Sequence, residues 1–189
     1  MNNKLLFIID PQIDFITGTL PVPDAKKAMD SLSEYLRLHN ADYVHIVVTA
    51  DRHPMLHCSF ESEGGKWPAH CVADSVGAAI WPSVMDSLLD IPDKITVLHK
   101  GENPDKEEYS ILKNKNATER IHAIIEAGSI GKIDICGIAG DVCVADTIHD
   151  WITSEKNAGL NVLKEFSPSI DGGKTLDLLI SKYGLSCVR

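Results

Sequence analysis

Apolar runs of strand length alternate along this chain with longer segments in which apolar residues recur at helical spacing. Most of the runs lack a regular apolar–polar alternation, which is typical of strands buried on both faces. We therefore expect strands at Leu5–Ile9, Tyr43–Thr49, Ile95–Leu98 and Ile133–Ile138, with two weaker strands at 162–163 and 185–188.

Four of the intervening segments are expected to form helices, because their apolar residues fall on one helix face. The clearest such stripe contains Val144, Ile148, Trp151 and Ile152. Asp24 is expected to cap the start of the first helix and Asn116 the start of the second. The expected stops are Gly128 for the second helix, Gly159 for the third and Gly184 for a fourth at about 174–183.

This alternation predicts an α/β fold, a three-layer sandwich around a mostly parallel central sheet. The length of 189 residues fits a single domain, 1–189, and we find no internal repeat or linker. Residues 50–93 interrupt the alternation with four prolines and a pair of glycines. Loops of that length inside a compact domain are usually functional.

Composition excludes several classes of partner. The net charge of −9 argues against nucleic acid or an anionic membrane. No apolar stretch approaches the roughly 20 residues of a membrane span, and the apolar run before Asp10 is too short for a signal peptide. Five cysteines without a framework spacing favour reduced thiols, so we expect a cytoplasmic location.

Four reactive side chains fall at or just beyond the C-terminal ends of different predicted strands: Asp10, Asp51, Lys100 and Cys143. In open α/β sheets, ligands bind outside the carboxyl ends of the strands. The convergence of these four residues on one sheet edge predicts an active site there.

Cys143 lies at the start of a predicted helix, where the macrodipole and unpaired N–H groups favour a thiolate and can stabilise an oxyanion. Asp10 could accept the thiol proton, and an ammonium at Lys100 would lower the thiol pKa. Each residue also has a plain alternative when taken alone. These are a buried structural cysteine, a turn-capping aspartate and a solvated lysine.

A second group combines Asp51 with His53, His57 and His70. Imidazoles together with one carboxylate suit zinc, iron or manganese better than calcium or magnesium. The alternative is a set of surface histidines on a polar loop.

Four segments also occur in a characteristic order. They are Ile8-Ile-Asp10-Pro-Gln-Ile-Asp14-Phe15, Thr49-Ala-Asp51-Arg-His53-Pro with Trp67-Pro-Ala-His70-Cys, His99-Lys100-Gly101 with Tyr109-Ser110, and Gly137-Ile-Ala-Gly-Asp-Val-Cys-Val144. Together they resemble the motifs of the isochorismatase-like cysteine hydrolases, most closely the nicotinamidase (pyrazinamidase) branch. The similarity extends from about residue 4 to 165.

The resemblance implies catalytic roles for these residues. Cys143 would be the nucleophile, Asp10 the general base and later acid, and Lys100 their charge partner. The backbone N–H groups of Ala139 and Cys143 would form an oxyanion hole, helped by a cis bond at Ile138–Ala139.

The same resemblance implies that Asp51, His53 and His70 hold one divalent transition metal, zinc ahead of iron or manganese. His57 is a candidate fourth ligand. In this family the metal coordinates the pyridine nitrogen, and Phe15 and Trp67 would wall the ring. The sequence departs from many relatives at 111–113, where an aromatic-rich continuation is replaced by Ile-Leu-Lys.

The resemblance predicts an amidohydrolase that converts nicotinamide to nicotinate and ammonia through a thioester on Cys143. Its partner would be a small amide, without nucleic acid or membrane, and a homo-oligomer is left open. Three alternatives remain at this point. They are another amide or ureide hydrolase of the family, a metal-hydroxide hydrolase in which Cys143 is incidental, and an inactive metal- or pyridine-binding module.

Overall fold

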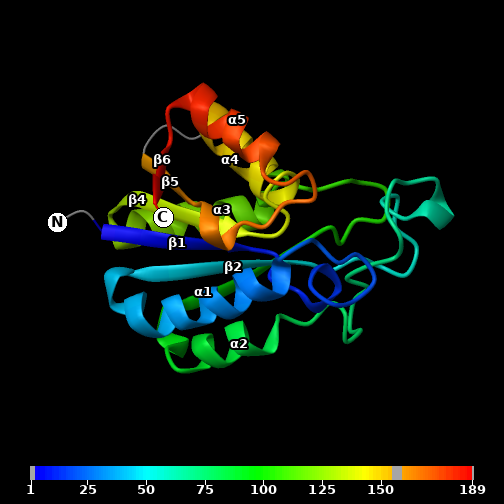
Figure 1. Cartoon of the computed structure of the whole chain (residues 1–189), viewed down its shortest axis with the longest axis horizontal. Helices are drawn as coiled ribbons and strands as arrows, with labels where there is room; N and C mark the ends of the chain where they lie inside the picture. The colour runs from blue at the N-terminus through cyan, green and yellow to red at the C-terminus, as the bar shows by residue number, and fades with distance from the viewer. Residues whose placement is uncertain (1–2, 155–158, 189) are drawn as a thin grey trace.

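A computed structural model of the chain describes residues 3–154 and 159–188, in which six strands form one sheet (Figure 1). The strands are β1 (Asn3–Ile9), β2 (His45–Asp51), β3 (Ile95–Lys100), β4 (Ile130–Gly137), β5 (Gly159–Leu163) and β6 (Ser186–Val188). Their order across the sheet is β3-β2-β1-β4-β5-β6, and every pairing is parallel. The predicted α/β sandwich is confirmed, and the sheet of the described residues is wholly parallel.

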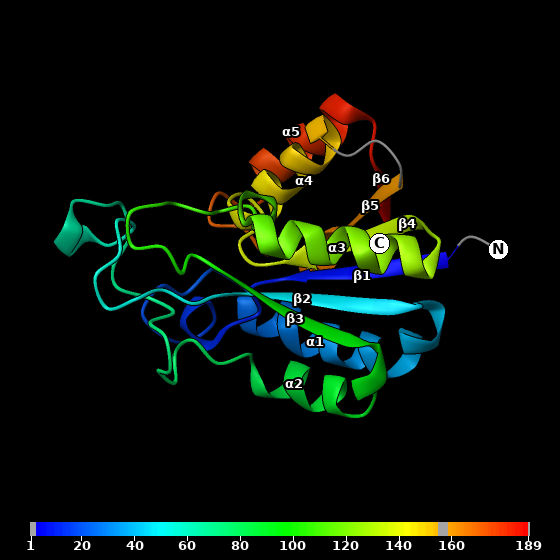
Figure 2. The same cartoon turned by 180° about the vertical axis from the view of Figure 1, so that it is seen from behind.

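Helices cover both faces of the sheet (Figures 1 and 2). One face carries α1 (Ala25–His39) and α2 (Pro82–Leu89), and the other carries α3 (Lys115–Gly128), α4 (Cys143–Ser154) and α5 (Lys174–Tyr183). No helix in the two described ranges is both long and apolar enough to cross a membrane.

Alternate residues of the central strand β1 point into two separate cores. Leu6 and Ile8 pack in the core that contains Met29 of α1. Phe7 lies in the opposite core with Ile148 of α4. Because successive strand residues face opposite sides, a strand covered on both faces must be apolar throughout, and this is the pattern from which β1 was predicted.

Helix α2 lies inside the 50–93 region, which was expected to be a loop throughout. Pro82 occupies its first position, where the fixed φ of proline suits a helix and its missing N–H is not needed. The expectation was wrong for this segment because Pro82 begins an element instead of interrupting one. The rest of the region is irregular backbone with short 3₁₀ turns.

Three of the expected caps and stops differ from the structure. The N-cap of α3 is Asn114, not Asn116. Asp24 precedes α1 but its side chain makes no cap bond. Gly159 begins β5 instead of ending α4. The side chain of Asn114 accepts the N–H of Ala117. Both asparagines are suitable acceptors in a polar run, so spacing alone does not decide between them.

Two glycines with positive φ provide a test of how tightly β4 packs on β1. Gly137 ends β4 at φ +131°, and a Cβ there would overlap the Ile9 carbonyl, whereas a Cβ on Gly172 (φ +72°) would meet nothing within 4 Å. Alanine at either position costs about 1–2 kcal/mol from the backbone conformation. Overpacking should lower the free energy of unfolding of Gly137→Ala by about 1–3 kcal/mol more. Urea unfolding followed by circular dichroism measures both, and equal losses would contradict this close approach.

Candidate active site

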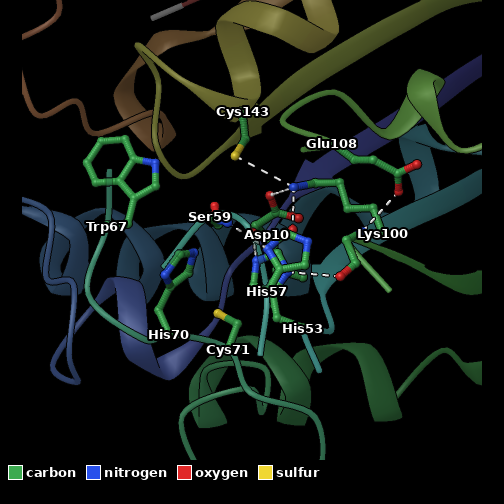
Figure 3. Close-up of polar contacts among 12 residues, drawn as sticks. Asp10, His53, His57, Ser59, Trp67, His70, Cys71, Lys100, Glu108 and Cys143 are labelled. Atoms are coloured by element: carbon green, nitrogen blue, oxygen red, sulfur yellow. Dashed lines mark hydrogen bonds and ion pairs between the residues drawn. The ribbon is translucent and has the colours of Figure 1, made fainter. Parts of the chain in front are cut away.

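The four reactive residues predicted to converge meet at the carboxyl edge of the sheet, and Figure 3 shows Asp10, Lys100 and Cys143 there. Asp10 follows β1, Asp51 ends β2, Lys100 ends β3 and Cys143 begins α4, and all four are buried. The Lys100 Nζ atom lies between the other three. It is 2.9 Å from Asp10 Oδ2, 2.6 Å from Asp51 Oδ1 and 3.7 Å from Cys143 Sγ.

Asp10 is held by the neighbouring strand and keeps one carboxylate oxygen free. Its backbone adopts a positive φ of 47°, a conformation that in non-glycine residues clusters at functional sites. Asp10 Oδ1 accepts a hydrogen bond from Thr49 Oγ1 at 2.6 Å. Asp10 Oδ2 lies near Lys100 Nζ but has no hydrogen-bond partner of suitable geometry among the described residues. Burial raises the pKa of Asp10 despite the opposing charge of Lys100, so this carboxylate is suited to accept a proton.

The surroundings of the Cys143 thiol favour its neutral form. Burial raises its pKa well above the usual value, and the charges of Asp10 and Asp51 add to that rise while Lys100 opposes it. One carboxylate oxygen of Asp10, one of Asp51 and Cys143 Sγ all lie within 4.8 Å of one another. The helix start alone therefore does not produce the thiolate that the sequence predicts, and the thiol proton needs an acceptor.

Two backbone N–H groups near the thiol are left without a protein acceptor. Val142 and Val144 donate to the Ala139 carbonyl, whereas the N–H groups of Ala139 and Cys143 donate to no residue of the described chain. The Ile138–Ala139 peptide is cis, as expected. Free N–H groups beside a nucleophile are the arrangement that binds an oxyanion.

Asp51, His53 and His70 form a compact group whose ligand atoms lie within 4.8 Å of one another. Each imidazole Nδ1 bonds to a backbone carbonyl, His53 to Gly101 at 2.9 Å and His70 to Pro68 at 2.7 Å. A carbonyl only accepts, so Nδ1 carries the proton and Nε2 offers its lone pair. Such carbonyl bonds are typical of metal-binding histidines. Two imidazoles and a carboxylate therefore fit a divalent transition metal.

The charges of the two groups are linked through Asp51. Burial opposes ionisation of this carboxyl, but Lys100 and then His53 outweigh burial and lower its pKa. Burial also opposes the charge of Lys100, yet Asp10 and Asp51 raise the pKa of its ammonium well above the usual value. The cluster thus contains one stable ammonium held between carboxylates.

His57 lies against His53, with ring centroids 4.1 Å apart, but outside the compact three-residue group. Its Nδ1 accepts the N–H of Ser59 at 3.2 Å, which places its own proton on Nε2. That Nε2 has no hydrogen-bond partner among the described residues. Since this tautomer offers no free lone pair, the geometry favours three protein ligands, and a fourth from His57 stays a prediction.

A pocket opens onto both groups. Phe15 and Trp67, the predicted ring walls, both line it, together with Ala139, Cys143 and His70. Cys143 and His70 thus face one space, where a small planar ligand could contact both.

Sequence reasoning missed the polar residues that hold this site in place. Gln12 is fully buried, donates to the Asp51 carbonyl and accepts the Asp51 N–H, both at 2.8 Å. Thr49 bonds Asp10, and the pocket residues Ser59 and Glu107 bond each other. Gln12 and Thr49 lie inside the motifs and close to strand ends, and this position was the available signal for them.

Comparisons with known proteins show to which family the chain is similar. The family model described as the isochorismatase domain matches residues 4–158. The nicotinamidase/pyrazinamidase of Mycobacterium tuberculosis is 29% identical over 180 residues, which cover 93% of this chain and 92% of that protein. The nicotinamidase of Saccharomyces cerevisiae is 28% identical over 173 residues, which cover 76% and 79%. The crystal structure of the Pyrococcus horikoshii pyrazinamidase in complex with zinc superposes with a TM-score of 0.83 at 30% identity, covering 99% of both chains.

Removal of the buried ammonium should destabilise the metal-free protein strongly. Lys100→Met would leave the carboxylates of Asp10 and Asp51 buried without a cation, at a cost of about 3–5 kcal/mol. The control Lys164→Met breaks an exposed pair with Asp177 and should cost at most about 1 kcal/mol. Urea unfolding in the presence of a chelator compares them. Equal losses would show that Lys100 does not neutralise the two carboxylates.

Proposed function

Because the chain belongs to the isochorismatase family, we propose that it hydrolyses nicotinamide to nicotinate and ammonia. The observation that carries the proposal is a buried Asp10–Lys100–Cys143 cluster whose Cys143 lines the same pocket as a three-residue metal group. The names of the relatives, nicotinamidase and pyrazinamidase, supply the substrate class.

In the first half of the reaction the thiol attacks the carboxamide. Cys143 Sγ forms a bond to the carbonyl carbon while its proton passes to Asp10, whose Oδ2 is free to receive it. The N–H groups of Ala139 and Cys143 stabilise the oxygen that becomes negative. Lys100 stays charged and holds the carboxylate in place.

The second half releases both products. Asp10 passes the proton to the departing nitrogen, the C–N bond breaks, and ammonia leaves a thioester on Cys143. Asp10 then takes a proton from water, whose oxygen attacks the thioester carbon. Nicotinate departs, and the proton returns to the thiol.

The pocket sets the orientation of the ring. Asp51, His53 and His70 would hold a divalent cation, with zinc ahead of iron or manganese, and when bound it would supply a Lewis-acidic partner for the ring nitrogen. Phe15 and Trp67 form the walls of the ring site.

The thiols of all five cysteines are free, which supports a reducing, cytoplasmic compartment.

Loss of one imidazole should remove metal and activity together. His53→Ala deletes a free Nε2 donor, so the protein should bind zinc at least about 10-fold more weakly and lose activity in parallel. His57→Ala should retain zinc, because the Nδ1 lone pair of His57 is already engaged by Ser59. Elemental analysis after gel filtration measures both. An equal loss of zinc from the two variants would show that His57 is a ligand.

The proposed function is tested by a series of four amides on one metal-replete preparation. Nicotinamide and pyrazinamide place a ring nitrogen meta to the carboxamide and should both turn over. Benzamide lacks that nitrogen and picolinamide moves it, so kcat/KM should fall about 10²-fold because the carbonyl is misplaced. Cys143→Ala should abolish turnover of all four while nicotinamide still binds. Equal rates for benzamide and nicotinamide would reduce the assignment to an unspecified amidase.

A further inference from the structure

Four pocket residues outside the catalytic and metal groups join two segments across the pocket mouth. Ser59 and Trp67 lie between His53 and His70 of the metal group, and Glu107 and Tyr109 belong to the segment that follows β3. Ser59 and Trp67 border the same space as the Cys143 thiol (Figure 3).

Glu107 is held on both of its carboxylate oxygens. Oε2 accepts a short hydrogen bond from Ser59 Oγ, and Oε1 accepts the N–H of Glu108 at 3.1 Å. Ser59 is buried, with 3% of its surface exposed. Glu107 also lies near the hydroxyl of Tyr109, whose pKa is raised by burial and then by the Glu107 charge.

Trp67 is held at two points by the residues that Glu107 contacts. Its backbone N–H donates to the Ser59 carbonyl at 3.0 Å. Its indole Nε1 donates to Tyr109 Oη, also at 3.0 Å. Glu107 therefore bonds the residue that fixes the backbone of Trp67, and it lies two positions before the residue that fixes the Trp67 ring.

Charge does not explain the position of Glu107. It forms no ion pair within the described ranges, and the same pocket already contains the carboxylate of Asp51. A carboxylate such as Glu107, placed near another carboxylate, is unfavourable unless its oxygens accept hydrogen bonds. All the hydrogen bonds described above come from neutral donors, Ser59 and the Glu108 amide.

We propose that Glu107 is a positioning residue that clasps the pocket mouth, holding Ser59, and through it Trp67, so that the Trp67 indole stays against the substrate ring. The proposal rests on the proposed function for the identity of that ring. Because the clasp touches neither Cys143 nor Asp10, it acts on binding and not on the chemical step.

The test compares Glu107→Ala with Glu63→Ala, which removes an exposed carboxylate from the same turn. For Glu107→Ala, KM for nicotinamide should rise about 10-fold, the size of one lost charge-assisted hydrogen bond. Its kcat should stay within about twofold. Glu107→Gln, which keeps one acceptor oxygen, should fall between wild type and Glu107→Ala. Glu63→Ala should match wild type, and zinc content should be the same in all four proteins.

A second measurement follows Trp67 directly. Acrylamide quenching of the Trp67 fluorescence, taken as the difference from a Trp67→Phe partner in each background, should increase in Glu107→Ala and not in Glu63→Ala. Unchanged quenching, or a loss confined to kcat, would overturn the clasp. If wild type hydrolyses no amide, the proposed function fails, and the quenching comparison alone then decides whether Glu107 fixes Trp67.

Discussion

The ammonium of Lys100 is the charge on which the rest of the site depends. It is fully buried at the end of β3, within 2.9 Å of one carboxylate and 2.6 Å of another. An unpaired charge of either sign would be strongly unfavourable at this depth. The three charged groups are therefore stable only together, and the parallel sheet brings them together. Asp51 and Lys100 are register partners on β2 and β3, and the Asp10 N–H donates to the Thr49 carbonyl of β2.

Asp51 connects this cluster to the metal group. One of its oxygens bonds Lys100, and the other lies 3.7 Å from His53 Nε2. A cation held by Asp51 and the two histidines would draw on the carboxylate that also neutralises Lys100. Metal binding and the ionisation of the Cys143 thiol would then be linked through one side chain. Gln12, which bonds both backbone groups of Asp51, holds that shared residue in position.

Sequence pattern predicted the parts of this protein that depend on periodicity and chain direction. The apolar runs located the strands, and the strand ends located Asp10, Asp51 and Lys100, because parallel strands share a carboxyl edge. The same reasoning missed α2, since Pro82 can either start a helix or interrupt one. It also predicted a thiolate at Cys143 from the helix start, whereas burial and two carboxylates raise its pKa. Such effects depend on distances between segments far apart in the chain.

The pair Ser59 and Glu107 shows the same limit at the pocket mouth. Neither residue stands out in the sequence, and 48 positions separate them, yet their side chains bond directly. Strand ends place the buried charged cluster, while the pocket wall is built from two loops joined by a hydrogen bond to the Glu107 carboxylate. The departure from relatives at 111–113 falls outside that ring site. Ile111 is fully buried in the core on the α3 and α4 side of the sheet and does not line the pocket. Ile111 therefore lies in the core behind the Tyr109 segment, away from the side chains that line the pocket.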